Sequence, residues 1–327
     1  MERTIPQFSF DQLVDRLIAL KVPYHANYLS MYSSWYGGIV VDPALMMVPV
    51  DDHLVHRGDG VFEAFKCIGG RIYGLDRHLD RLERSARGIF MDLPCDRSSM
   101  VRIVRATVRA AGVLDAMIRL FVSRGPGGFS TNPYECPASQ LYVVCSRFQP
   151  TPPEKFQKGV TLKSSHVPIK KAYLANMKSC NYLPNVLMKK EAQDAGVDFT
   201  VSIDEAGFLG EGSTENVGIV TRGGEFLVPR FDRVLQGITV TRVMELAADL
   251  VGRGLLARVG EADITPAEAY EAAEVLVFGT SFDILPVVRY DDRVIGDGRP
   301  GPWAARLLEL LREDMTTCGA MLTSVED

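Results

Sequence analysis

The hydrophobic positions of this 327-residue chain repeat with helical spacing in some stretches and alternate as in strands in others. Residues 9–20 open with Ser9 and Gln12 at the spacing of a capping box, and the apolar residues after them share one helical face, which predicts an N-terminal helix. The pattern then predicts strands at 37–41, 45–50, 61–67, 70–74, 116–123 and 140–146, with helices at 75–90 and 98–112.

A proline-rich stretch divides the chain near its middle. Residues 147–156 carry three prolines and little to bury, which is typical of a linker. After it the pattern predicts strands or hairpins at 160–165, 198–204, 217–229, 274–280 and 287–296, and helices at 239–252, 265–274 and 302–314. We expect a helical extension at 1–31, a small domain at 32–147, a linker at 148–155 and a large domain at 156–327. Strands and helices mix without steady βαβ alternation, so the expected class is α+β with partly antiparallel sheets.

Composition narrows the class of protein. With 46% hydrophobic and 24% charged residues, the chain can bury a sizeable core. A net charge of −5 and a pI near 5.7 give no overall attraction to nucleic acid or to anionic membranes, and no run of about 18 apolar residues could span a bilayer. The N-terminus lacks the pattern of a signal peptide and the six cysteines form no C-x-x-C pair, so we expect a cytoplasmic protein with reduced thiols.

Lys178 differs from the other lysines near it. It stands at or just before a helix that ends at Gly196, among small and polar neighbours, whereas Lys189 and Lys190 fall on the polar side of that helix. The buried side of the helix is expected to contain Val186, Leu187, Ala192 and Ala195. A lysine in a cleft can form a Schiff base with an aldehyde cofactor such as pyridoxal phosphate, although most lysines are simply solvated.

Two further residues could serve such a cofactor. Glu211 lies between Gly210 and Gly212, just before a predicted strand, where its carboxylate could bind a protonated pyridine nitrogen; a plain turn with a solvated glutamate is the alternative. Tyr182 follows Lys178 by four residues, one helical turn, so its hydroxyl could reach the cofactor's phenolic oxygen; the alternative is a tyrosine of the core.

Three short features could hold a phosphate. The stretch from Gly237 through Ile238 and Thr239 leads from a turn into a helix, whose first N–H groups are free, although ordinary capping explains the same residues. Thr280 and its neighbours form a second group of small donors, and Arg81 would add a permanent positive charge. By contrast, His53 and His56 have no second pair or acidic cluster beside them, so we expect no metal.

These residues lie in stretches that together resemble the class IV aminotransferases, the pyridoxal-phosphate enzymes of fold type IV. The similar stretches are 56–86, 178–220, 235–243 and 278–287, in the family's order. The resemblance runs from about residue 32 to the last helix. It implies a small α/β domain and a larger domain with a mostly antiparallel, barrel-like sheet, and a non-catalytic relative of the same fold is disfavoured because Lys178 and Glu211 are both present.

The resemblance also implies roles for individual residues. Lys178 would be the Schiff-base lysine that shuttles the proton, Glu211 would pair with the pyridine nitrogen of pyridoxal 5′-phosphate, and Tyr182 would lie by its phenolic oxygen. The phosphate would be held by Arg81, Gly237, Ile238, Thr239 and Thr280. As in the family, we expect a homodimer whose loops close the neighbour's active site, and the apolar runs at 45–50 and 127–133 suit such an interface.

The substrate is less tightly specified by the resemblance. Alternation along 116–123 turns Arg119 away from Ile118 and Leu120, and Arg119 matches the strand arginine that receives the α-carboxylate in branched-chain enzymes, although Met117 replaces their tyrosine. Phe62 would form an apolar wall and Ser281 would lie beside the substrate. An apolar amino acid is therefore the first choice of donor.

Two other members of the family stay open as alternatives. The loop 123–128, with Arg124, is similar to that of aminodeoxychorismate lyase, which makes the lyase the runner-up. D-amino-acid aminotransferases are the other alternative, and they carry an arginine and a histidine in the following loop. This chain has Gly127, Gly128, Phe129 and Ser130 there, so the carboxylate trap of those enzymes is missing.

Overall fold

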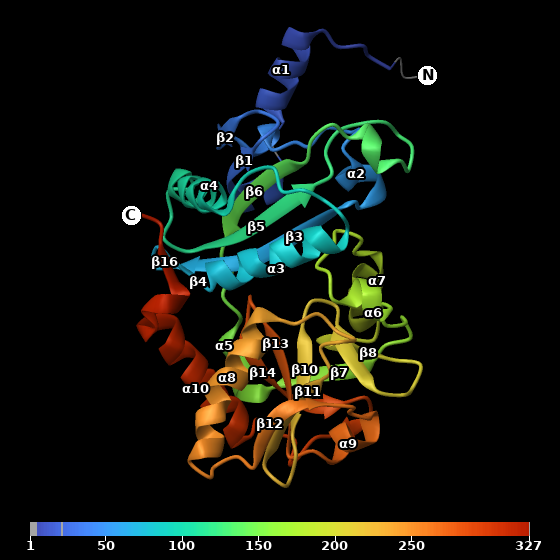
Figure 1. The fold of residues 1–327 in the computed structure, drawn as a ribbon, viewed down its shortest axis with the longest axis vertical. Coiled ribbons are helices and arrows are strands. Elements are labelled where there is room, and N and C mark those ends of the chain that lie inside the picture. Colours follow the sequence, from blue (N-terminus) through green and yellow to red (C-terminus); the bar gives the residue numbers. More distant parts are fainter. Residues whose placement is uncertain (1–4, 21, 327) are drawn as a thin grey trace.

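The computed structural model describes residues 5–20 and 22–326 and contains two separate β-sheets (Figure 1). The first sheet has seven strands in the order β16-β4-β3-β5-β6-β1-β2, all paired antiparallel. Its strands are β1 (Tyr28–Ser33), β2 (Gly38–Val40), β3 (Gly60–Ile68), β4 (Arg71–Tyr73), β5 (Ala116–Ser123), β6 (Gln140–Arg147) and β16 (Leu322–Ser324). Two glycines with positive φ, Gly69 and Gly70, make the hairpin turn between β3 and β4.

One face of this sheet is covered by helices and the other is open. Helices α3 (Leu75–Gly88) and α4 (Arg97–Ala110) pack on the covered face. Strand β5 alternates as predicted, because Ile118 and Leu120 are fully buried in that core while Arg119 lies on the opposite face. Arg119 is therefore available to a ligand on the open side.

The second sheet is longer and curls into a half-barrel. It has nine strands, in the order β12-β11-β10-β13-β14-β7-β8-β9 with β15 added beside β14, and most pairs are antiparallel. Because the end strand β9 also contacts β10 and β11, the sheet curves back on itself. The strands are β7 (Val160–Ser164), β8 (Phe199–Ile203), β9 (Leu209–Gly212), β10 (Asn216–Val220), β11 (Glu225–Pro229), β12 (Arg258–Ala262), β13 (Glu274–Gly279), β14 (Asp283–Tyr290) and β15 (Arg293–Val294).

Helices flank the half-barrel, and the whole arrangement confirms the predicted two-sheet α+β fold of type IV. Helices α8 (Ile238–Gly252) and α10 (Pro302–Thr317) pack against one side of β13 and β14 in a shared apolar core. The remaining helices of this half are α5 (Pro153–Lys158), α6 (Ala172–Ala175), α7 (Leu183–Asp194) and α9 (Pro266–Glu271).

The two halves are joined at more than one place. The chain passes between the sheets from β6 to β7, and it returns at its end, where β16 pairs with β4 of the first sheet. A buried ion pair also joins them, since Lys66 Nζ of β3 lies 2.5 Å from Asp283 Oδ1 of β14. The sequence-based domain boundaries stay a prediction.

The N-terminal region was predicted partly right and partly wrong. Helix α1 (Phe10–Ala19) has the expected capping box and extends from the body without a buried residue (Figure 1). The 3₁₀ turn η1 (Pro23–Asn27) follows α1 and leads into β1. The strand predicted at 45–50 is absent from the described structure: the 3₁₀ turn η2 (Pro43–Leu45) is followed there by an irregular segment and then by the short helix α2 (His53–Arg57). Pro43 and Pro49 lack the N–H groups that a strand there would need. No helix in the described part of the chain has the length and apolarity to cross a membrane.

Candidate active site

Lys178 is held between the two halves of the molecule by its own backbone. Its N–H donates to Ser85 Oγ of α3 at 3.1 Å, and its carbonyl accepts from the N–H of Phe62 in β3 at 2.9 Å. The next residue, Ser179, bridges Val61 in antiparallel fashion. The segment thus pairs with the start of β3, on the side that β4 leaves free because β4 pairs only with Cys67 and Ile68. This pairing fixes the direction of the lysine side chain.

This pairing corrects two details of the sequence analysis. Helix α7 begins only at Leu183, so Tyr182 is not one helical turn beyond Lys178; the two meet because the chain between them bends around the edge of β3. The buried side of α7 also differs in part: Val186 and Leu187 are 57% and 45% exposed and Ala195 is exposed, whereas Ala192 is buried as predicted. Asn185, Met188 and Ala192 face inward, because the Asn185 amide donates to the carbonyl of Ser213 at 2.6 Å.

A cavity of about 400 Å³ lies around the Lys178 side chain. The Lys178 amine is 4.6 Å from the ring centre of Phe62 and 6.0 Å from that of Tyr182. The cavity is lined by seven of the residues predicted for the site, which are Lys178, Arg81, Tyr182, Phe62, Arg119, Thr280 and Ser281. Residues from both sheets and from α3 therefore converge on one amine.

The environment of Lys178 favours its neutral form. Burial lowers the pKa of this lysine, and the positive charge of Arg81 lowers it further, to about 8 despite the carboxylates of Glu63 and Glu211. Such an amine can take up and release a proton near neutral pH, unlike a solvated lysine. Lys189 and Lys190 are exposed, as predicted.

Glu211 faces the same space from the half-barrel. It lies within the short strand β9, which was not predicted, and the predicted strand follows as β10 from Asn216. The N–H of Leu235 donates to Glu211 Oε2 at 3.0 Å. Burial raises the pKa of Glu211, although Lys170 opposes the rise. Glu211, Lys170, Tyr182 and Lys178 line one narrow hollow beside the main cavity.

Lys170 is a residue that the sequence analysis missed. Its Nζ lies 5.0 Å from the ring centre of Tyr182, and burial lowers its pKa. It comes from the irregular segment before α6, where no periodic pattern indicates burial.

Arg81 belongs to a buried cluster that the sequence did not reveal. Its Nε and Nη2 each donate to the Glu63 carboxylate at 2.7 Å, and His78 Nδ1 lies 2.6 Å from the same carboxylate. Burial raises the pKa of Glu63, but Arg81 and His78 outweigh this and bring it to about 2. A signal was present, since Glu63 interrupts an apolar strand while His78 and Arg81 are three apart on one helix.

Arg81 also reaches the start of helix α8. Its Nη1 donates to the carbonyl of Gln236 at 3.0 Å, directly before Gly237, the N-cap residue. A Cβ on Gly237 would lie 1.9 Å from Asn216 Oδ1, so a larger residue would displace that side chain, whose amide donates to the carbonyl of Leu235 at 2.9 Å. The N–H groups of Ile238 and Thr239 are in the first turn and have no partner within the helix.

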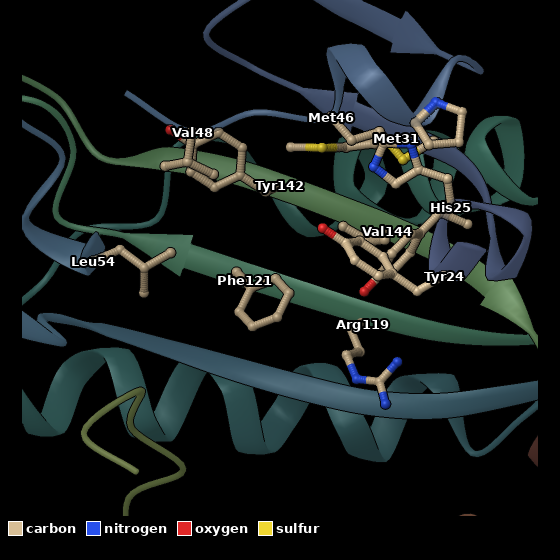
Figure 2. Close-up of a pocket in the computed structure, with 12 residues that line it drawn as sticks. Tyr24, His25, Met31, Met46, Val48, Leu54, Arg119, Phe121, Tyr142 and Val144 are labelled. Carbon is tan, nitrogen blue, oxygen red and sulfur yellow. The ribbon is translucent and has the colours of Figure 1, made fainter. Parts of the chain in front are cut away.

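A second, larger cavity adjoins the first on the open face of the first sheet. It measures about 590 Å³, and Arg119 and Phe121 of β5 line both cavities. Figure 2 shows Tyr142 and Val144 of β6 on its floor and Tyr24 near Arg119. Neither this cavity nor the contribution of the N-terminal segment was predicted, because both depend on side chains from distant segments.

Two other residues considered above lie elsewhere. Arg124 is occupied, because its Nε and Nη2 each donate to the Asp59 carboxylate at 3.0 Å and its other donors reach the carbonyls of Ile89 and Phe90. His53 Nε2 lies 3.0 Å from the carbonyl of Gly128. Within the described residues, no group of three or more histidine, cysteine or acidic side chains could hold a metal.

Residues 60–290 match the family model described as amino-transferase class IV. The chain is 43% identical over 292 residues to a chloroplastic D-amino-acid transaminase of Arabidopsis thaliana, covering 88% of this chain and 77% of that one. It is 33% identical to a putative branched-chain-amino-acid aminotransferase of Methanocaldococcus jannaschii, covering 87% of this chain and 97% of that one. The crystal structure of a branched-chain amino acid aminotransferase of T.th. with pyridoxamine 5′-phosphate superposes with a TM-score of 0.85, at 28% identity, over 91% of this chain and 99% of that one.

Proposed function

Because the chain belongs to the class IV aminotransferases, which use pyridoxal 5′-phosphate, we propose that it transfers an amino group between an apolar amino acid and a 2-oxo acid. The observation that carries the proposal is the Lys178 amine in a cavity with a guanidinium group on either side. Arg81 and the start of α8 suit a phosphate at one end, and Arg119 suits a carboxylate at the other.

The donor set fits this cofactor. When bound, the cofactor supplies an aldehyde that receives the amino group and a ring that accepts electrons from the reacting carbon. The Oε1 atom of Glu211 would accept a hydrogen bond from the ring nitrogen, because Oε2 is bonded by Leu235. Thr280 and the N–H groups of Ile238 and Thr239 would join Arg81 at the phosphate.

Lys178 would act as the acid and base of the reaction. With a pKa lowered to about 8, its Nζ can remove the proton from the α-carbon of the donor and, in the second half of the transfer, deliver a proton to the α-carbon of the amino acid formed from the 2-oxo acid. Tyr182 would hold the cofactor's phenolic oxygen, and Phe62 would exclude water from the reacting atoms because its ring lies 4.6 Å from Nζ.

D-amino acids are a second candidate for the amino donor. The Arabidopsis relative named as a D-amino-acid transaminase is 43% identical, whereas the branched-chain relatives are 31% to 33% identical. This favours testing apolar D-amino acids beside their L-enantiomers. The lyase alternative loses support, because Arg124 is engaged by Asp59 and by two backbone carbonyls.

A donor screen tests the proposal directly. The holoenzyme is supplied with L- and D-forms of alanine, valine, leucine, methionine and phenylalanine, with 2-oxoglutarate or pyruvate as acceptor. We expect amino transfer with the apolar donors in one configuration. Release of pyruvate from aminodeoxychorismate without any amino transfer would overturn the proposal in favour of the lyase.

Arg119 gives a sharper test of substrate binding. We expect Arg119→Met to raise the KM for the apolar donor by about 10-fold or more while the cofactor absorbance is unchanged, because the α-carboxylate loses its positive partner. Arg289→Met, on the exposed end of β14, is the matched control. An unaltered KM would remove Arg119 from the substrate site.

We also propose a homodimer in the cytosol. Leu45, Met47, Val50 and Phe129 are exposed by 41% to 72%, and this apolar surface adjoins the open face of the first sheet. The six free cysteines agree with a reducing compartment. A monomeric mass by light scattering in a fully active preparation would contradict the dimer.

A further inference from the structure

The larger cavity on the open face of the first sheet is not needed by the cofactor. It shares Arg119 and Phe121 with the cavity at Lys178 but is not lined by Lys178 itself. Its other lining residues include Tyr24, His25, Met46 and Val48 (Figure 2). Tyr24 and His25 come from η1, ahead of residues 60–290 that match the family model. The N-terminal segment therefore contributes to a space that adjoins the reacting atoms.

A row of aromatic rings joins the two cavities. The ring of Phe62 meets Tyr182 edge-on at 5.1 Å and stacks on Phe121 at 5.8 Å between ring centres. Phe62 also lies beside the Lys178 amine, and Phe121 lines the larger cavity. An apolar chain attached to a carbon at Lys178 could thus follow aromatic surface past Arg119 into the larger cavity.

The lining of the larger cavity is matched to one kind of group. Met31, Met46, Val48 and Val144 are apolar, and the hydroxyl of Tyr142 is already engaged, because it donates to Asp52 Oδ2 at 2.8 Å. The Arg119 guanidinium stands at the junction of the cavities. The space therefore suits an apolar chain whose carboxylate remains at Arg119.

We propose that this cavity is a side-chain subsite for large apolar amino donors, either long and unbranched or aromatic, and that Tyr24 and His25 form its outer wall. The proposal rests on the proposed amino transfer. The cofactor and the donor's α-carbon would occupy the cavity of about 400 Å³ at Lys178, so a long side chain needs the adjoining 590 Å³. The N-terminal segment thereby becomes a determinant of substrate size.

Filling the subsite is the first test. Met46→Trp and Val144→Trp each place an indole in the cavity, while Leu255→Trp, at a residue that is 51% exposed and lines neither cavity, is the matched control. We expect the kcat/KM of the holoenzyme for phenylalanine and methionine to fall about 10-fold or more, with alanine changed less than about 2-fold. Tyr24→Ala, which opens the wall without inserting bulk, should reduce only the preference for phenylalanine over alanine.

Binding of phenylbutyrate gives a readout that does not depend on turnover. By calorimetry with the holoenzyme, we expect Met46→Trp to weaken phenylbutyrate binding about 10-fold or more and Leu255→Trp to leave it unchanged. If no donor is transaminated but this loss is seen, the proposed function fails and the subsite stands. If transfer occurs while the donor profile and phenylbutyrate binding are unchanged in every cavity variant, the subsite is wrong.

Discussion

Buried charge is treated in opposite ways at the phosphate end of the site, around Arg81, and at the ring end, where Lys178 and Glu211 line the hollow beside the main cavity. At the phosphate end, Arg81 is 5% exposed and Glu63 is 0% exposed, and the two form a two-pronged ion pair that His78 completes. At the ring end, Lys178 and Glu211 are half-buried, and no ion pair within 4.0 Å is found for either among the described residues.

The difference appears in the pKa values. Partners outweigh burial at Glu63 and hold its pKa at about 2, whereas burial prevails at Lys178 and at Glu211, lowering the first pKa to about 8 and raising the second. Removing one partner of a buried ion pair destabilises the fold. Charged groups with shifted pKa values and no direct partner are typical of a site that binds a ligand. The phosphate end can therefore be tested by the free energy of unfolding. The ring end can be tested by activity and by the pH dependence of unfolding.

The largest effect is expected at Lys178. Lys178→Ala should abolish amino transfer, because no other amine occupies the position from which Nζ would move the α-proton. The fold should persist, since the backbone contacts of this residue with Ser85 and Phe62 do not need the side chain. Lys189→Ala, on the exposed side of α7, is the control. Turnover at the wild-type rate in Lys178→Ala would contradict the assignment.

Glu211 should show the next largest effect. Glu211→Gln keeps a hydrogen bond to the ring nitrogen but no longer favours its protonated form, so we expect kcat to fall by about two orders of magnitude or more while the cofactor remains bound. Cofactor content by absorbance and kcat for the best donor measure the two effects separately. An unchanged kcat would mean that another group, with Lys170 or Tyr182 nearest, sets the charge of the ring.

At the paired end the expected effect is on stability. Glu63→Gln leaves Arg81 buried with a neutral partner, which should cost about 3 kcal/mol in urea unfolding of the cofactor-free protein. Glu309→Gln, from an exposed pair with Arg306, should cost less than about 1 kcal/mol. The Glu63 pKa is lowered by folding, so its contribution is complete above about pH 4.5 and is lost as pH falls toward 2. Equal losses in both variants would show that the buried cluster is not held by its charges.

The sequence was sufficient for some parts of this picture and not for others. Periodicity predicted α1, the face of β5 that carries Arg119 and most strands of both sheets, because local spacing determines them. It failed at 45–50, where Pro49 lacks the N–H that a strand needs. It also failed on α7, where the hydrogen bond from Asn185 to the carbonyl of Ser213 turns a polar residue inward. The Arg81 cluster left a local signal, the charged Glu63 within an apolar strand, whereas the N-terminal wall of the larger cavity comes from a distant segment, which no short window of sequence can reveal.

The smallest expected effect is the pH dependence of stability at the unpaired end. Folding lowers the Lys178 pKa from 10.5 to about 8, so between these values the unfolded chain binds more protons and stability rises with pH. Between pH 7.5 and 9.5, the cofactor-free wild type should gain about 2 kcal/mol more than Lys178→Met, measured by urea unfolding. The methionine keeps the length of the side chain but cannot titrate, so the difference in slope isolates the amine. Parallel pH curves for the two proteins would mean that Lys178 is compensated after all, and the contrast between the two ends of the cavity would then disappear.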